Sequence, residues 1–187
     1  MILVICGPSG SGKTTLLGHL SEIIPGLQPL ESITTRPPRA TDQPGEYAHV
    51  SENKFREIGN NCELLWHVKI GAYRYGTRKK AVDDALSAGF NVAIITIDAA
   101  QKLHRYVMRH RKLGLTRSLY LYIDDETELR RRMKARGGLS PSEIEERLIE
   151  GREWNKEAKK DDHFRKIDAL RSTPEEITET AINLWRM

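Results

Sequence analysis

Long apolar runs and cysteines are scarce in this chain of 187 residues, and each scarcity excludes a class of protein. No apolar run approaches the roughly 20 residues that a helix needs to cross a bilayer, which excludes a membrane-spanning protein. Cys6 and Cys62, the only cysteines, stand in apolar contexts without metal-like spacing. They predict buried thiols in a reducing compartment. The opening residues lack the basic leader that is typical of a signal peptide, so we expect a cytoplasmic protein.

The composition indicates a globular protein that is long enough for one well-packed domain. Apolar residues make up 39% of the chain and charged residues 30%, which suits a protein with an aqueous surface. The sequence has no internal repeat, no low-complexity tract and no linker long enough to separate two domains. We therefore expect a single domain over residues 1–187.

The net charge of +4 conceals two basic blocks, at residues 104–112 and 130–136. Blocks of this kind bind nucleic acid or phosphorylated small molecules in some proteins, although a solvated helix face is the commoner explanation. We expect no nucleic-acid partner. Only the block at residues 130–136 has neighbouring sequence that indicates a function.

Short apolar runs alternate with helical patterns along almost the whole chain, which predicts an α/β fold with a mainly parallel sheet flanked by helices. The expected strands are residues 2–6, 30–34, 64–68, 91–97, 118–123 and 164–167. The expected helices are residues 13–24, 51–60, 77–88, 99–113, 125–136, 141–160 and 174–186. Two of these helix starts carry a hydroxyl N-cap, a proline and a glutamate in the order that begins a helix.

A phosphate-binding loop follows the first expected strand. Gly7-Pro-Ser-Gly-Ser-Gly12-Lys13-Thr14 matches G-x-x-x-x-G-K-[ST] at every fixed position and precedes a helix. The glycines let backbone N–H groups converge on phosphate oxygens, and Lys13 neutralises the β- and γ-phosphates. The Thr14 hydroxyl is positioned to ligate Mg²⁺. The expected ATP-binding residues are Gly7, Ser9, Gly10, Ser11, Gly12, Lys13, Thr14 and Thr15.

The loop alone leaves the reaction open, because GTPases, motors and small-molecule kinases share it. The chain lacks an Asn-Lys-x-Asp element that would bind a guanine cofactor. Its short length and lack of a second domain favour a compact kinase.

A candidate acceptor site lies in a loop rich in proline and polar residues. Arg36 and Arg39 stand three residues apart, and their forked donors suit a phosphorylated acceptor. Tyr47 and Tyr75 follow, although tyrosines also commonly pack at the edge of a core. Asp98 ends an expected strand, where a carboxylate reaches Mg²⁺ or caps the next helix.

The sequence resembles a guanylate kinase through a set of motifs in the family's order. These are "GPSGSGKTTL", "TTRPPR", "GEY" before "VS", "YGT", "ID", "RRMKARG" and "IEERL". The resemblance implies the P-loop nucleoside monophosphate kinase fold, with ATP as phosphoryl donor and Mg²⁺ as cofactor. It also implies a core (residues 1–31 and 77–187), an acceptor-binding insertion (about 32–76) and a lid (about 130–150).

The resemblance assigns further roles by position. Arg36, Arg39, Tyr47 and Tyr75 would hold the acceptor's α-phosphate, and Ser32, Thr77 and Asp98 would contact its base or surroundings. Thr77 is also an N-cap candidate for the next helix. Lys13, Arg131, Arg136 and Arg147 would be catalytic. Arginines suit this role because phosphoryl transfer spreads negative charge over equatorial oxygens. The Gly137-Gly138 pair would be the hinge of the lid.

One family feature is missing. A guanylate kinase carries a glutamate before a tryptophan or similar residue, where it accepts hydrogen bonds from guanine. Here Leu65 precedes Trp66, and an ungapped alignment from Tyr75 places Trp66 itself at that position. Glu63 shares a strand face with Leu65 and lies two residues away.

Three functions therefore remain open. The first is transfer of the γ-phosphoryl group of ATP to a nucleoside monophosphate, with GMP or dGMP as best candidates. The second is the same chemistry on another phosphorylated acceptor, such as ribose 1,5-bisphosphate or a modified nucleotide. The third is a non-catalytic interaction module, against which the intact phosphate loop argues. The sequence leaves a homodimer open.

Overall fold

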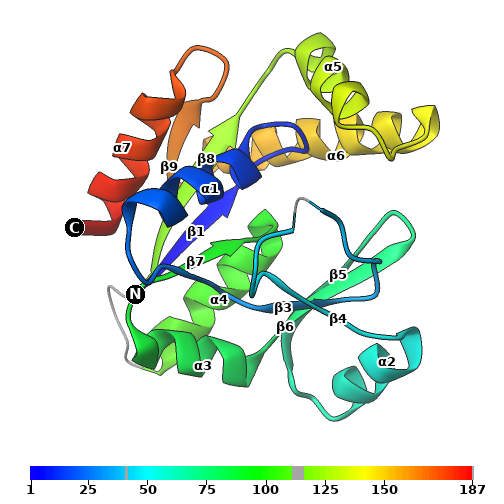
Figure 1. Ribbon diagram of the computed structural model, residues 1–187, viewed down its shortest axis with the longest axis vertical. Coiled ribbons are helices and arrows are strands. Elements are labelled where there is room, and N and C mark those ends of the chain that lie inside the picture. The colour runs from blue at the N-terminus through cyan, green and yellow to red at the C-terminus, as the bar shows by residue number, and fades with distance from the viewer. Residues whose placement is uncertain (41, 111–115, 187) are drawn as a thin grey trace.

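A five-stranded parallel sheet forms the centre of the computed structural model, which describes residues 1–40, 42–110 and 116–186. The central strand is β1 (Ile2–Cys6), whose Ile2 pairs with Asn91 on one side and Thr116 on the other. In spatial order the strands are β2 (Gln28–Pro29), β7 (Asn91–Ile94), β1, β8 (Thr116–Tyr122) and β9 (Phe164–Asp168). The predicted α/β fold is confirmed (Figure 1).

Helices cover both faces of this sheet, because alternate residues of β1 point to opposite sides. Leu3 and Ile5 join one apolar cluster, and Ile2 and Val4 join another. The first cluster includes side chains from α1 (Lys13–Ile23) and α7 (Pro174–Arg186), and the second from α3 (Lys79–Ala88) and α4 (Ile97–Arg109). None of the described helices combines the length and apolar character needed to cross a membrane.

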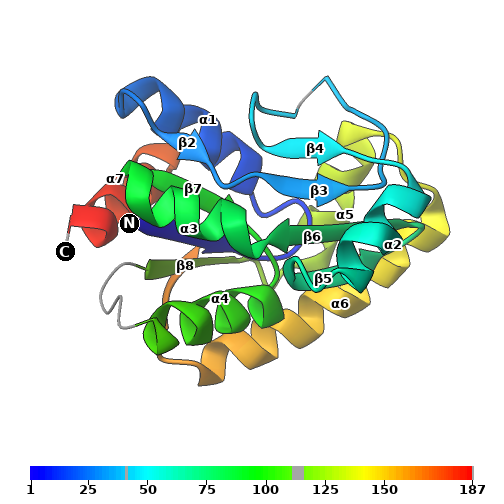
Figure 2. The same cartoon turned by 90° about the horizontal axis from the view of Figure 1, so that it is seen from below.

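A smaller, mixed sheet lies beside the carboxyl end of the main sheet (Figure 2). Its strands are β4 (Tyr47–His49), β3 (Ser32–Thr34), β6 (Tyr73–Arg78) and β5 (Leu64–Ile70), in that order. The strand β3 runs parallel to β4 and antiparallel to β6. Helix α2 (Glu52–Asn60) packs Phe55 and Ile58 against Ile33 of β3, which gives this sheet a core of its own.

Two consecutive helices, α5 (Glu126–Arg136) and α6 (Pro141–Lys160), extend past the phosphate loop (Figure 1). Gly137 and Gly138 join them with φ angles of 72° and 74°, a conformation that glycine adopts without strain. A capping box between Ser140 and Glu143 begins α6. The two glycines therefore end α5, and the capping box begins α6, so the sequence itself separates the two helices.

Some expected elements differ from the observed ones. Thr77 lies inside β6 rather than capping a helix, because strand pairing with Trp66 continues through it and α3 begins at Lys79. The expected strand 91–97 ends at Ile94, and Thr96 caps α4. The last residues of the expected helix 99–113 lie outside the described part of the chain. Cys62 is exposed, not buried, and only Cys6 is a core thiol.

Helix α6 is locked to the phosphate loop by a close approach of its backbone. A Cβ atom at Gly151 would lie 2.8 Å from Cβ of Pro8, so only glycine fits there. One turn further, the buried Asn155 side chain accepts from the Tyr120 hydroxyl (2.9 Å) and donates to the Ile123 carbonyl (3.0 Å). These contacts fix the helix that carries Arg147 relative to β8 and the loop.

We therefore expect Gly151→Ala to destabilise the protein and Gly18→Ala to stabilise it, although both glycines are helical. The added methyl group at residue 151 overpacks against Pro8, at a cost of about 1–3 kcal/mol in the free energy of unfolding. At Gly18 nothing lies within 4 Å, so the higher helix propensity of alanine contributes up to about 1 kcal/mol. Urea unfolding of both variants tests this, and equal shifts would contradict the close packing of α6.

Candidate active site

A cavity of about 490 Å³ opens where β1 and β7 end, and we call it the central cavity. Gly7, directly after β1, and Ile94 and Ile95, at the end of β7, form its floor. Ligands of open parallel sheets bind at this edge, beyond the carboxyl ends of the strands. The phosphate loop, the smaller sheet and helices α5 and α6 supply the walls.

The phosphate loop has a backbone conformation that only glycine allows. Gly7, Gly10 and Gly12 have φ angles of 148°, 87° and 99°. A Cβ atom at Gly7 would lie 2.3 Å from the Leu121 carbonyl oxygen. Gly12 is the N-cap of α1 and brings no side-chain cap, and the first turn of α1 contains no acidic residue. The positive end of α1 is thus left for an anion.

Lys13 is held under the loop by two backbone carbonyls. Its Nζ donates to the Gly7 oxygen at 2.7 Å and the Pro8 oxygen at 2.8 Å. Burial, and after it the nearby charges of Arg136 and Arg147, lower the pKa of Lys13 to about 8. A phosphate group beside this amine would favour its protonated, charged form. The sequence predicts the same pairing, in which Lys13 neutralises the phosphates of the donor.

The remaining loop residues differ in their access to the cavity. All the expected ATP-binding residues except Ser11 line the central cavity. Ser11 is buried, and its hydroxyl finds no hydrogen-bond partner among the described residues. Thr14 lines the cavity, so its hydroxyl fits a magnesium ion, which in such sites takes most of its ligands from phosphates and water.

Asp98 does not lie where the sequence places it. It belongs to the first turn of α4, is 64% exposed and pairs with Lys102 at 2.7 Å. It is absent from the residues that line the central cavity. The physical reason is that β7 ends three residues earlier than the expected strand. Asp98 therefore lies outside the cavity in which it was predicted to contact the acceptor and magnesium.

Three arginines of the lid segment reach the cavity, and one of them was not predicted. Arg136 and Arg147 line it, and Arg147 donates to the Ser9 hydroxyl at 3.0 Å. Arg132 also lines it and donates to the Gly10 carbonyl at 3.3 Å. Arg131, which the sequence reasoning chose, is 69% exposed and pairs with Glu128. Spacing gives the reason, since residues 132 and 136 share a helix face and residues 131 and 136 do not.

The arginines of the acceptor loop converge with two tyrosines. Arg36, Arg39, Tyr47 and Tyr75 all line the central cavity. The Arg36 guanidinium lies 5.2 Å from the centre of the Tyr47 ring, and the two tyrosine rings meet edge to face at 6.1 Å. Burial lowers the pKa of Arg39, and the charge of Arg36 lowers it further. Two crowded, partly buried cations of this kind suit a phosphate dianion.

Asp42, which the sequence reasoning did not single out, holds the acceptor loop in shape. Its carboxylate accepts from Arg36 (2.7 Å) and from the backbone nitrogen of Arg39 (2.8 Å). Although burial opposes its charge, these hydrogen bonds lower the pKa of Asp42. The signal in the sequence is an aspartate within a loop rich in proline and polar residues, where aspartate is common.

The wall of the cavity on β5 is apolar. Trp66, Val68 and Ile70, alternate residues of β5, line it, and Trp66 is buried. Ser32 also lines it, and its hydroxyl hydrogen-bonds at 2.8 Å to that of the buried Thr77, which lies behind the cavity wall. Glu63 is exposed, pairs with Arg78 and does not line the cavity. Thus β5 supplies no carboxylate to this site.

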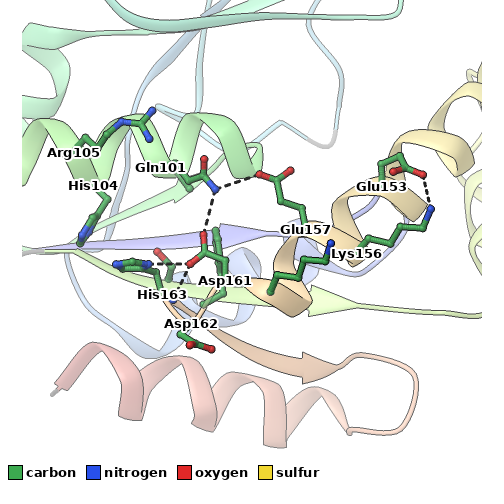
Figure 3. Close-up of a pocket in the computed structure, with 13 residues that line it drawn as sticks. Gln101, His104, Arg105, Glu153, Lys156, Glu157, Asp161, Asp162 and His163 are labelled. Carbon is green, nitrogen blue, oxygen red and sulfur yellow. Dashed lines mark hydrogen bonds and ion pairs between the residues drawn. The ribbon is translucent and has the colours of Figure 1, made fainter.

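A second cavity, of about 900 Å³, lies between α4 and α6 (Figure 3). Its polar groups mostly satisfy one another. Gln101 donates to Glu157 at 3.2 Å and to Asp161 at 3.3 Å, and Asp161 also pairs with His163 at 2.9 Å. None of the residues predicted to bind ATP or the acceptor lines it. Its larger volume therefore does not make it the candidate active site.

Comparison with known proteins shows that this chain is similar to guanylate kinases. A family model described as guanylate kinase matches residues 1–168. The guanylate kinase of Wolbachia sp. subsp. Brugia malayi (strain TRS) is 31% identical over 179 residues, covering 95% of this chain and 90% of that protein. That of Streptomyces kasugaensis is 35% identical over 149 residues, covering 79% of this chain and 70% of the relative. The crystal structure of guanylate kinase from Anaplasma phagocytophilum superposes with a TM-score of 0.68 at 22% identity, covering 100% and 84% of the two chains.

We expect nucleotide affinity to fall as Lys13 loses its proton. With a pKa of about 8 in the free protein, the charged fraction falls, and so does ATP affinity, by roughly 20-fold between pH 7.5 and pH 9.5. Calorimetric titration with ATP over this range measures the effect. In Lys13→Arg the side chain stays charged, so the ATP affinity of this variant should not change with pH. In a separate assay of turnover, Lys13→Ala should be inactive. A wild-type profile as flat as that of Lys13→Arg would contradict the assignment.

Arg132→Ala and Arg131→Ala form a matched pair on neighbouring residues. Loss of Arg132 removes a cation from the cavity wall, and we expect kcat to fall by roughly 10²-fold or more. Loss of Arg131 breaks an exposed ion pair with Glu128, and kcat should stay within about threefold of wild type. Steady-state kinetics at saturating ATP distinguish them, and the reverse order would show that the lid arginines are wrongly placed.

Proposed function

The chain belongs to the guanylate kinase family, and we propose that it transfers the γ-phosphoryl group of ATP to GMP or dGMP, giving the nucleoside diphosphate and ADP. One observation carries this proposal. The phosphate loop lines the same central cavity as Arg36, Arg39 and Tyr47. A donor triphosphate and an acceptor phosphate would therefore lie close enough for direct transfer.

The chemistry follows from the positions of the charges. An oxygen of the acceptor's α-phosphate attacks the γ-phosphorus in line, a new P–O bond forms, and the bond to the β,γ-bridging oxygen breaks to release ADP. Lys13 and the first turn of α1 hold the donor phosphates, and Arg36 and Arg39 hold the acceptor phosphate. Arg132, Arg136 and Arg147 stabilise the charge that develops on the equatorial oxygens.

Magnesium and a moving lid complete the proposal. Mg²⁺, held by the Thr14 hydroxyl and the phosphates, would neutralise charge on the β- and γ-phosphate oxygens. Nothing lies within 4 Å of a Cβ atom placed at Gly137 or Gly138, so these residues form a hinge that would let α5 close over the donor. We also propose a cytoplasmic location, which suits the free Cys6 and the exposed free Cys62.

A second acceptor class is favoured by one specific observation. Trp66 and its neighbours on β5 present an apolar wall where a family member would present a glutamate. A site without that carboxylate discriminates less strongly among bases. Another phosphorylated acceptor, such as ribose 1,5-bisphosphate or a modified nucleotide, would still find Arg36 and Arg39 in place. The non-catalytic module is disfavoured, because the loop and all its charged partners are intact.

The decisive experiment measures ADP release from Mg²⁺–ATP with a panel of acceptors: GMP, dGMP, AMP, CMP, UMP and ribose 1,5-bisphosphate. We expect GMP and dGMP to give the highest kcat/KM, with Lys13→Ala as the inactive control. Preference for ribose 1,5-bisphosphate or for a base other than guanine would support the second acceptor class instead. No release with any acceptor would leave only the interaction module.

A further inference from the structure

The glutamate at the third position of α5 departs from the arrangement that begins the next two helices. In α6 the carboxylate of Glu143 accepts from the backbone nitrogen of Ser140 at 2.8 Å, and a glutamate of α7 makes the same contact. Helix α5 offers the same pieces, with Asp125 as N-cap and Glu128 three residues later. The described contacts of the Glu128 carboxylate, however, are all with arginines. A side chain that leaves its local role in this way indicates a function elsewhere.

Two arginines share the Glu128 carboxylate. Its Oε1 atom accepts from Nε of Arg132 at 2.7 Å and from Nη2 of Arg131 at 2.8 Å, and its Oε2 atom accepts from Nε of Arg131 at 2.7 Å. The side chain of Glu128 is 18% exposed, whereas that of Arg131 is 69% exposed. Hydrogen bonds from Arg131 and then from Arg132 lower the pKa of Glu128 to about 2, so the carboxylate stays ionised in any ordinary assay.

Arg132 joins this carboxylate to the phosphate loop. Its Nη1 atom donates to the Gly10 carbonyl at 3.3 Å, so the guanidinium is held at two points. A guanidinium has about five N–H donors, and the donors that remain find no acceptor among the described residues. Arg132 lines the central cavity and Glu128 does not. The remaining donors therefore suit the oxygens of a donor phosphate, and Glu128 sets their direction from outside the cavity.

Resting on the proposed function, we propose that Glu128 is a positioning residue that holds the Arg132 guanidinium against the phosphate loop, so that its remaining N–H groups meet the γ-phosphoryl group during transfer. Glu128 touches no substrate and acts only through Arg132. Donors that are already oriented stabilise developing charge without reorganising at the moment of reaction. Arg131 supports the carboxylate from its exposed side, and its loss would leave the bond between Glu128 and Arg132 in place.

The test is a double-mutant cycle on kcat, measured at saturating Mg²⁺–ATP and GMP. Glu128→Ala removes the oxygen that orients Arg132, and kcat should fall by roughly 10-fold, because catalytic groups tolerate little misplacement. The KM for ATP should stay within about threefold of wild type, because the charge of Arg132 remains. In the Arg132→Ala background the same substitution should change kcat by less than about twofold, since the group that Glu128 orients is already absent.

Two further variants separate orientation from charge. Glu128→Gln can keep an oxygen at the position that accepts from both arginines, so kcat should stay within about threefold of wild type. Glu126→Ala is the matched control, because it removes a carboxylate from the same first turn of α5 and its partner, Arg152, does not line the central cavity. Loss of this exposed ion pair should leave kcat within about twofold of wild type.

Four outcomes would overturn the inference. An unchanged kcat in Glu128→Ala would show that Arg132 needs no orienting partner. An equal loss in the Arg132→Ala background would show that Glu128 acts independently of Arg132. A loss in Glu126→Ala as large as that in Glu128→Ala would show that charge at the start of α5 matters, and not the direction of one arginine. An equally large loss in Glu128→Gln would show that the negative charge matters, and not the oriented oxygen.

Failure of this inference is distinguishable from failure of the proposed function. If the wild-type protein phosphorylates GMP and the cycle is additive, only the assignment of Glu128 is wrong. If another acceptor is preferred, the same cycle is measured with that acceptor, because Arg132 acts on the donor phosphates. If the wild-type protein releases no ADP with any acceptor, the proposed function is wrong, and this inference with it.

Discussion

Mutual repulsion among the six cationic side chains that the described residues place around one cavity is the constraint on which this structure depends. They come from three separate parts of the chain: Lys13; Arg36 and Arg39; and Arg132, Arg136 and Arg147. Their proximity is visible in the lowered pKa values of Lys13 and Arg39, to which neighbouring arginines contribute after burial itself. A fold tolerates such a cluster only if rigid elements hold it, as Gly151 against Pro8 and Asp42 against Arg36 do here. A polyanionic ligand that binds in this cavity would be stabilised by these charges.

The elements that the sequence predicted best are those whose signals are local. Helices α6 and α7 begin and end at the expected residues. Their starts were predictable because each has a proline in the first turn and a capping glutamate. The phosphate loop was predicted equally well, because its glycine, lysine and threonine residues have a fixed spacing. In contrast, β4 and β6 were not expected as strands. Their pairing with β3 and β5 depends on contacts between distant segments, which no local pattern reports.

The site shows the same division between local and distant information. The residue types and their loops were predictable, but the face that each side chain presents was not. Arg132 replaced Arg131 at the cavity because one helical position changes the direction of a side chain by about 100°. Asp98 moved to the surface because β7 is shorter than its apolar run.

The central claim is that donor and acceptor phosphates share one cavity and react directly, without a phosphorylated protein intermediate. The most direct measurement uses ATP made chiral at the γ-phosphorus with oxygen isotopes and sulfur, followed by stereochemical analysis of the phosphoryl group in the product. A single in-line displacement predicts inversion of configuration. Retention would show two successive transfers through a protein side chain, and it would contradict the shared cavity as the place of direct reaction.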